Sequence, residues 1–180
     1  MLEIILGLIA AAVVVFLGVV AMQPGEFRVV RSGPIPAPAA AVFPHVNELR
    51  KWEAWSPWAR LDPSAKSTFE GPAAGVGSSM AWAGNKNVGE GKMTIIESRA
   101  NELVQFRLEF YKPFKATNTA TFTFKPEGNQ TVVTWSMSGT NNFMGKAINV
   151  FINCDKMVGG QFEQGLANMR AAVEASRGQA

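Results

Sequence analysis

The stretch from Asn142 to Arg177 carries the clearest hydrophobic pattern of the chain. Apolar residues recur there three or four positions apart, which predicts one long amphipathic helix lying against a broad apolar surface. The apolar stripe consists of Ala147, Phe151, Cys154, Val158, Phe162, Leu166, Met169 and Val173. Most charged residues of this stretch fall off the stripe and are expected to face water.

Gly159 and Gly160 lie inside this predicted helix, where each costs about 1 kcal/mol relative to alanine. Three arrangements would explain them: a kink, a joint between two shorter helices, or a close approach of the backbone to the sheet or to a ligand. Gly165 on the same helix favours the close approach.

The preceding part of the chain alternates polar and apolar residues with a period of two. The alternating segments, bounded by Gly, Pro and Asn, are 26–35, 67–70, 77–83, 88–98, 104–111, 115–125 and 131–139. Two short helices are expected after the first strand, over residues 39–46 and 47–55, the second with Asn47 as its N-cap. Ile96 interrupts the alternation, which predicts a bulge or burial on both faces.

One-sided alternation and hairpin-length links are typical of an antiparallel sheet with one solvated face. We therefore predict an α+β domain in which a curved antiparallel sheet of about seven strands wraps around the long C-terminal helix.

The N-terminus differs in kind, because residues 4–22 include no charged or strongly polar side chain. That length matches the roughly 20 apolar residues that cross a bilayer as a helix. A cleaved signal peptide is the alternative, but the segment lacks a basic n-region and exceeds the usual apolar run of about 7–15 residues. We predict a single-pass transmembrane anchor and linker over residues 1–25 and a ligand-binding domain over residues 26–180. Arg28 and Arg31 follow the span, which favours a cytoplasmic domain.

Several short motifs resemble a known family. They are Trp55-Ser56-Pro57-Trp58 with Asp62-Pro63, then Trp82-Ala83-Gly84-Asn85, Val88-Gly89-Glu90-Gly91, and Gly159-Gly160-Gln161-Phe162-Glu163-Gln164-Gly165-Leu166. With the element order, they make Phe27 to Ala175 similar to the START-related helix-grip (SRPBCC) superfamily, in its polyketide cyclase/dehydrase-like branch. This resemblance implies a hydrophobic cavity between helix and sheet, used in different members for lipids, small aromatic compounds or polyketides.

The residue inventory argues against several kinds of chemistry. His45 is the only histidine and Cys154 the only cysteine, so the zinc motifs built from repeated His and Cys do not occur. There is no Gly-x-Ser-x-Gly elbow to accompany a serine nucleophile, and His45 is expected to lie on a helix surface or at a cap. Gly75-Val76-Gly77 leads into a strand rather than a helix, unlike a dinucleotide-binding loop. We expect neither a metal nor a cofactor.

A formal net charge of +3 comes from basic residues that are scattered along the chain, so a nucleic-acid footprint is not indicated. The partners expected are instead a hydrophobic small molecule or lipid and, through residues 4–22, the membrane.

The inward side chains of the predicted sheet are first of all core, but many of them are methionine or aromatic, the residue types that line adaptable apolar pockets. Trp52, Trp55 and Trp58 are expected either to form an aromatic gate or to pack the short helices on the sheet. Asn118 is the one strongly polar residue on an inward row and is expected to orient a ligand or to satisfy a bulge. The candidate ligand-binding residues are Trp55, Trp58, Met80, Trp82, Met93, Phe106, Phe110, Asn118, Phe122, Trp135, Met137, Val158 and Phe162.

Three functions fit these features. The preferred one is a membrane-anchored domain that binds an apolar small molecule or lipid without altering it. The second is a cyclase or aromatase that holds a reactive polyketide-like chain, since positioning alone lowers a reaction barrier by several kcal/mol. The third is an interaction module that docks a membrane partner.

Overall fold

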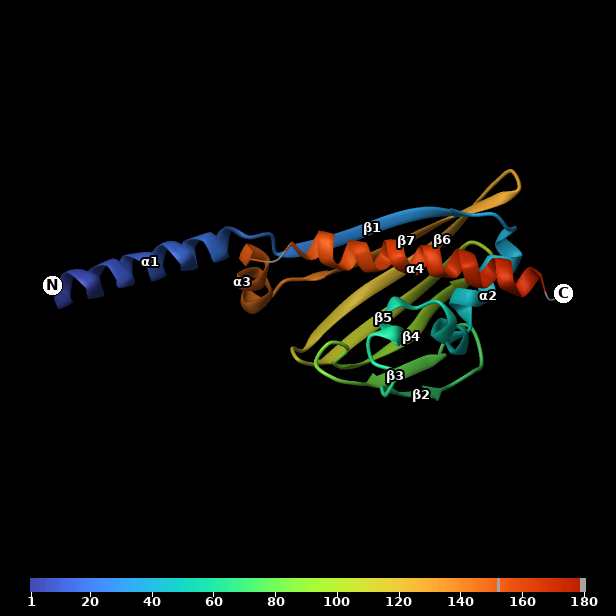
Figure 1. Ribbon diagram of the computed structural model, residues 1–180, viewed down its shortest axis with the longest axis horizontal. Helices are drawn as coiled ribbons and strands as arrows, with labels where there is room; N and C mark the ends of the chain where they lie inside the picture. Colours follow the sequence, from blue (N-terminus) through green and yellow to red (C-terminus); the bar gives the residue numbers. More distant parts are fainter. Residues whose placement is uncertain (152, 179–180) are drawn as a thin grey trace.

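The computed structural model describes residues 1–151 and 153–178 and consists of a protruding N-terminal helix and a sheet that wraps over a long C-terminal helix (Figure 1). The elements are α1 (Leu2–Met22), β1 (Glu26–Ile35), α2 (Ala39–Asn47), the 3-10 helices η1 (Leu49–Ala54) and η2 (Pro57–Arg60), β2 (Lys66–Glu70), β3 (Ser79–Ala83), β4 (Glu90–Arg99), β5 (Leu103–Lys112), β6 (Ala116–Glu127), β7 (Gln130–Thr140), α3 (Phe143–Phe151) and α4 (Cys154–Arg177).

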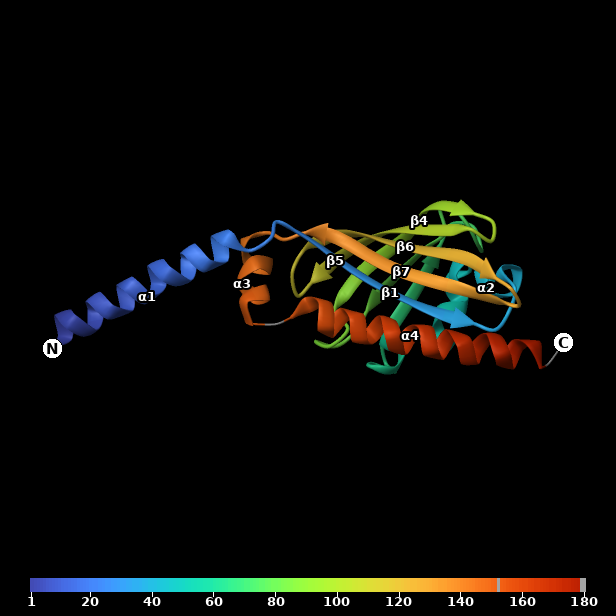
Figure 2. The ribbon, with the colours of Figure 1, turned by 90° about the horizontal axis from the view of Figure 1, so that it is seen from above.

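The helix α1 projects away from the rest of the molecule (Figure 2). The most apolar 18-residue window of this 21-residue helix has a mean hydropathy of 3.1 and is 6% buried, so by length and composition α1 can span a membrane. A linker of three residues, Gln23 to Gly25, joins it directly to β1. The sheet therefore lies close to any structure in which α1 is embedded.

The seven strands form one antiparallel sheet in the order β1-β7-β6-β5-β4-β3-β2. This confirms the predicted helix-grip architecture. The register of β4 against β5 shifts between Ile95 and Glu97, which confirms the bulge expected at Ile96. The bulge leaves Ile96 41% exposed.

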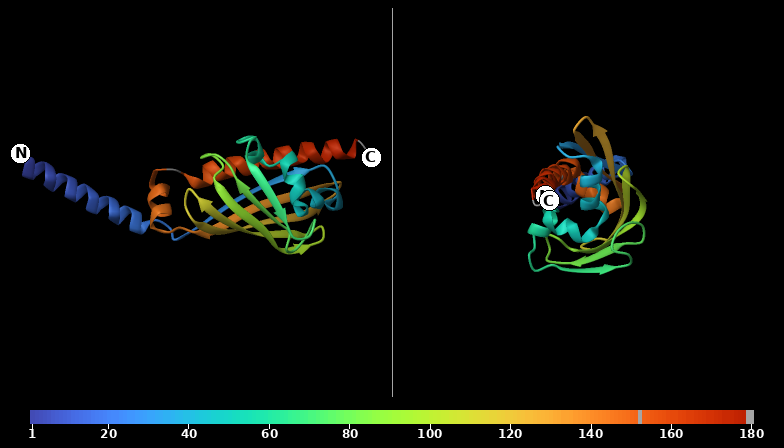
Figure 3. Two further views of the ribbon diagram at one scale, coloured as in Figure 1. Left: turned by 90° about the horizontal axis from the view of Figure 1, so that it is seen from below. Right: turned by 90° about the vertical axis from the view of Figure 1, so that its right-hand side faces the viewer.

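The short helices and α4 lie on the same, inner face of the curved sheet (Figure 3). The largest fully buried side chains come from all three layers, with Phe106 and Phe122 from the sheet, Trp55 from the short-helix segment, and Phe162 and Met169 from α4. Residues at helical spacing on α4, Phe162, Leu166, Met169 and Val173, supply its buried stripe, as the periodicity predicts.

The C-terminal pattern folds as two helices rather than one, and the break falls before Asn153 rather than at Gly159-Gly160. Asn153 starts α4 as its N-cap, because its side-chain oxygen accepts a hydrogen bond of 2.9 Å from the Lys156 backbone N–H. Phe151, expected on the buried stripe, is 77% exposed. The side chain of Cys154 lies outside the described residues.

The short-helix region also differs in detail from the prediction. Residues 49–54 and 57–60 form 3-10 turns, and the second of these was not predicted. Asn47 ends α2 instead of capping a second helix, and its Oδ1 accepts a hydrogen bond of 2.8 Å from the Ser98 hydroxyl on β4. The Asn47 side chain, expected to cap a helix, therefore links α2 to the sheet instead.

Arg31 fastens α4 to β1. It pairs with Trp135 across β1 and β7, so both side chains lie on the inner face of the sheet. Its guanidinium donates to Asp155 at 3.0 and 3.1 Å and to Glu163 at 2.6 Å. Gly159 lies directly against that guanidinium, so a Cβ there would fit only if the Arg31 side chain moved. The close approach expected from the glycines is thus present at Gly159, where the partner is an arginine of the sheet.

Candidate functional site

The strand register sorts the inner face into rows that run across the sheet, because paired residues share a face. Two rows lie nearest α1, and we call them the proximal rows. They consist of Phe27, Gly139, Asn118, Leu108, Met93, Met80 and Phe69, and of Phe110, Gly91 and Trp82. The next two, the distal rows, consist of Val29, Met137, Ala120, Phe106 and Ile95, and of Trp135, Phe122 and Val104.

The distal rows are filled by aromatic packing. The Trp135 ring stacks on Phe162 of α4 with centroids 4.0 Å apart and on Phe122 at 4.6 Å. The rings of Trp52, Trp55 and Trp58 meet Trp135 edge-on at 5.6–6.1 Å. The indole N–H groups of Trp52 and Trp55 donate to the backbone carbonyls of Val46 and His45, each at 2.9 Å. These tryptophans therefore pack the short helices onto the sheet.

The proximal rows are covered less completely. Met80, Trp82, Leu108 and Phe110 are only partly buried, as is Phe27 at the other side of the sheet. Val158 of α4, one turn before Phe162, is also partly buried. An apolar surface that stays partly open on the inside of a curved sheet is suited to holding an apolar guest.

The candidate residues named from sequence therefore divide into two groups. Trp55, Trp58, Phe106, Phe122, Trp135, Met137 and Phe162 belong to the distal packing, and Met80, Trp82, Met93, Phe110, Asn118 and Val158 to the proximal rows or the part of α4 next to them. The structure adds Phe27, Leu108 and Phe69 to the proximal rows. The apolar alternation of their strands could have identified Phe27 and Leu108.

Asn118 is the polar side chain of the proximal rows. It is 8% exposed, and its Oδ1 has no hydrogen-bond partner among the described residues. Its amide lies over the Cα of Gly139, where a side chain on β7 would collide with it. A buried amide oxygen without a partner costs about 1–3 kcal/mol. A donor on a bound guest would remove this cost, so Asn118 is a candidate for orienting a guest.

Two of the family-like motifs meet at Asp62. Its carboxylate accepts from the Ser64 hydroxyl at 2.6 Å and from the Asn85 backbone N–H at 2.6 Å. These hydrogen bonds, the Ser64 hydroxyl first, hold the pKa of Asp62 below its ordinary value. The Asp62-Pro63 motif thus has a structural role, because it joins the loop after η2 to the β3–β4 turn.

Acid is expected to weaken this junction. Because the folded pKa of Asp62 is depressed, its contribution to stability is complete above the unfolded pKa of about 3.9 and is lost as the pH falls through the folded value. Asp62→Asn should therefore make the free energy of unfolding less dependent on pH below about pH 5. Urea midpoints of both proteins at a series of pH values measure this, and an unchanged slope would contradict it.

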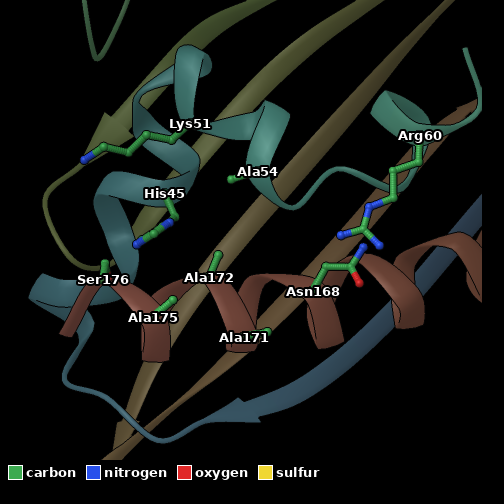
Figure 4. Close-up of a pocket in the computed structure, with 9 residues that line it drawn as sticks. All are labelled: His45, Lys51, Ala54, Arg60, Asn168, Ala171, Ala172, Ala175 and Ser176. Carbon is green, nitrogen blue, oxygen red and sulfur yellow. The ribbon is translucent and has the colours of Figure 1, made fainter. Parts of the chain in front are cut away.

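A separate groove of about 430 Å³ lies between the short helices and the C-terminal half of α4 (Figure 4). It is lined by His45, Lys51, Ala54, Arg60, Asn168, Ala171, Ala172, Ala175 and Ser176. None of the candidate ligand-binding residues lines it. His45, expected at a helix surface, is 9% exposed, and burial followed by the charge of Lys51 lowers its pKa. Apart from the His45 imidazole, the groove is lined by small, cationic and amide side chains.

Among the described residues, no group of three His, Cys, Asp or Glu side chains could hold a metal ion. Two carboxylates of α4, Asp155 and Glu163, form ion pairs with Arg31 of the inner face. This pairing lowers the pKa of Asp155 and raises that of Arg31. The polar groups of the inner face thus include the Asn118 amide, the Arg31 guanidinium and the Trp135 indole N–H, which, like Asn118 Oδ1, has no hydrogen-bond partner among the described residues.

Comparison with known proteins agrees with this geometry. Residues 26–174 match the family model described as "Polyketide cyclase / dehydrase and lipid transport". No curated protein matches the sequence significantly.

Solved structures show the same fold at low sequence identity. The protein CV1439 from Chromobacterium violaceum is 15% identical with a TM-score of 0.59, covering 84% of this chain and 99% of its own. Mll3558 from Rhizobium loti is 14% identical with a TM-score of 0.61, covering 81% and 96%. DynU16, from the dynemicin biosynthetic locus, is 14% identical with a TM-score of 0.57, covering 85% of this chain and 48% of its own. The matched family model spans β1 to α4, and the chain belongs to the polyketide cyclase / dehydrase and lipid transport family.

Proposed function

We propose that this protein is a single-pass, membrane-anchored domain that binds an apolar small molecule or lipid on its proximal rows without altering it. The observation that carries the proposal is the partly open apolar inner surface with the unpaired Oδ1 of Asn118 in its midst. The family description, which includes lipid transport, supports the same class of ligand. Burying about 200 Å² of apolar ligand surface contributes about 5 kcal/mol before the costs of binding.

We propose α1 as the anchor, with the domain on the cytoplasmic side. Glu3 and the amino terminus precede the span, whereas Arg28 follows it closely. The linker of three residues keeps the sheet next to the bilayer, where an apolar ligand is most concentrated.

The test compares lipids retained by the full chain and two arginine variants purified in mild detergent. Leu108→Arg places a charge on the proximal rows, whereas Thr117→Arg places the same charge on the outer face, opposite Glu109. Organic extracts quantified by mass spectrometry should contain a compound held by the wild type and by Thr117→Arg but reduced about tenfold, or 1.4 kcal/mol, in Leu108→Arg. Lipids held only by α1 should be equal in all three. Equal extracts throughout would refute binding at the proximal rows.

Asn118→Leu should separate stability from binding. Because leucine removes a buried oxygen without a partner, the free energy of unfolding should rise by about 1 kcal/mol. Retention of a ligand that carries a hydroxyl or amide donor should fall at the same time. Urea unfolding and the same extraction assay measure the two effects. A loss of both would instead mean that Asn118 supports the fold.

A cyclase-type reaction is the second candidate, favoured by the family description and by Asn118 as a polar group facing the guest. It predicts that a poly-β-keto thioester is released in cyclised form, at a rate lowered by Trp82→Ala and Asn118→Ala. Recovery of the same compound unchanged would support binding alone.

A further inference from the structure

The helix α3 has an apolar side that the protein does not cover. Phe143, Met144 and Phe151 are 56%, 52% and 77% exposed, and none of the nine residues of α3 is buried. At 3.6 residues per turn these three fall on one side of the helix together with Ala147, while Lys146 and Asn149 fall on the other. An uncovered apolar helix face of this kind is typical of a helix that lies in a membrane interface.

The contacts of α3 with α1 indicate that a membrane covers this apolar side. The Phe151 ring stacks on Phe16 of α1 with centroids 5.8 Å apart, and the Lys146 ammonium donates to the Ala21 carbonyl at 3.5 Å. Asn141, just before α3, binds the linker through its backbone N–H to the Gly25 carbonyl at 2.8 Å. α3 is therefore held against the last turns of α1 and runs across it (Figure 2).

If α1 is the membrane anchor proposed above, the contact between Phe16 and Phe151 fixes the depth of α3 in the bilayer. A helix of 21 residues is about 31 Å long, close to the hydrocarbon thickness of about 30 Å. Phe16 lies six residues before the end of α1, or about 9 Å along its axis. Phe151 then lies at the depth of about 5–10 Å to which interfacial helices bury their apolar side.

The β5–β6 hairpin reaches toward the same end of the domain (Figure 1). Its tip carries Phe114, which is 55% exposed, between Lys112 and Lys115, and Tyr111 is 46% exposed beside it. Aromatic rings beside lysines are enriched where a protein meets lipid head groups. The register places this hairpin at the proximal end of the inner face, since Phe110 pairs with Ala116 just before the tip.

We propose that α3 and the β5–β6 tip together form a docking surface for the lipid bilayer that carries α1. α3 inserts its apolar side into the head-group region, and the hairpin tip rests on the surface beside it. The domain is thereby fixed with its proximal rows next to the bilayer, so that a lipid can reach them without crossing the aqueous phase.

Spin labels on single cysteines test this with the full chain in liposomes of phosphatidylcholine and phosphatidylglycerol. In a Cys154→Ser background, labels are placed at Met144→Cys on the apolar side of α3 and Asn149→Cys on its polar side. Val14→Cys in α1 reports the anchor, and Ala175→Cys at the far end of α4 reports the aqueous phase. Relaxation by oxygen and by a water-soluble nickel chelate gives the depth of each label.

The expected result is a Met144 label several-fold more accessible to oxygen than to nickel, at a shallower depth than the Val14 label, with Asn149 and Ala175 accessible to nickel. A Met144 label as accessible to nickel as Ala175, with Val14 still embedded, would overturn the docking surface and leave the anchor intact. If Val14 itself is accessible to nickel, the anchor is refuted and the docking surface with it. A Phe114→Cys label fully accessible to nickel and distant from the lipid would overturn the hairpin's part.

Discussion

Trp135→Ala is expected to lower the free energy of unfolding by about 3–5 kcal/mol, the usual cost of removing a large aromatic side chain from a core. Trp135 is 2% exposed and lies between Phe162 of α4 and Phe122 of β6, with the tryptophans of the short helices around it. One ring thus joins three layers that are distant in the sequence. Since domains are stable by only about 5–15 kcal/mol, this change removes a large share of the total.

Trp82→Ala is the matched control, because Trp82 is an inward tryptophan of the proximal rows that is only partly buried. Its loss should cost clearly less than that of Trp135. Pulse proteolysis of the full chain in detergent over a urea series measures both variants without depending on tryptophan fluorescence. Equal losses would contradict the division between a filled distal interior and a partly open proximal one.

Alanine substitutions at the three glycines of α4 should have three different results. At Gly165 the new methyl group would lie 2.7 Å from the Trp135 ring and 3.2 Å from Pro57 Cδ. Both neighbours are rigid, so we expect a loss of about 1–3 kcal/mol from overpacking. At Gly160 nothing lies within 4 Å, and the substitution should stabilise the protein by up to about 1 kcal/mol.

At Gly159 the methyl group meets only the guanidinium of Arg31, which can move aside on its flexible stem. Gly159→Ala should therefore keep the fold but break the ion pairs with Asp155 and Glu163. Its stability should depend less on salt than that of the wild type, because exposed ion pairs are screened. The same urea series at low and high salt measures all three variants. A stability gain at Gly165 as large as that at Gly160 would contradict the close packing of α4 on Trp135.

Local patterns predicted much of the fold because burial on one face imposes a period on the sequence. β5 alternates cleanly since Val104 and Phe106 face the core while Arg107 faces water. The stripe of α4 holds from Phe162 to Val173 for the same reason.

Arg31 shows where such patterns fail. The adjacent Val29 and Val30 obscure the alternation of β1, and the partners of Arg31 lie more than a hundred residues away in the sequence. Nothing local indicates that a charged residue faces inward. The glycines of α4 were a better signal: of the three arrangements they allowed, the close approach is the one present, because Gly159 and Gly165 lie against tertiary neighbours while the helix continues through them.

For the candidate site, the sequence predicted only which face of the sheet would carry it. Period-two alternation identifies which side chains point inward, but how far the short helices reach over them depends on tertiary packing. That is why Trp55 and Trp135 were named beside Asn118 as binding residues, although the structure packs the two tryptophan rings against each other.

Photocrosslinking of the full chain in its membrane with a phospholipid that carries a diazirine in its acyl chain tests the central claim most directly. After proteolysis, mass spectrometry locates the crosslinked residues. We predict crosslinks on β3, β5 and β6 at Met80, Trp82, Leu108, Phe110 and Asn118, and their loss in Leu108→Arg. Crosslinks confined to α1 and α3, with none on the inner face of the sheet, would contradict the proposed binding surface.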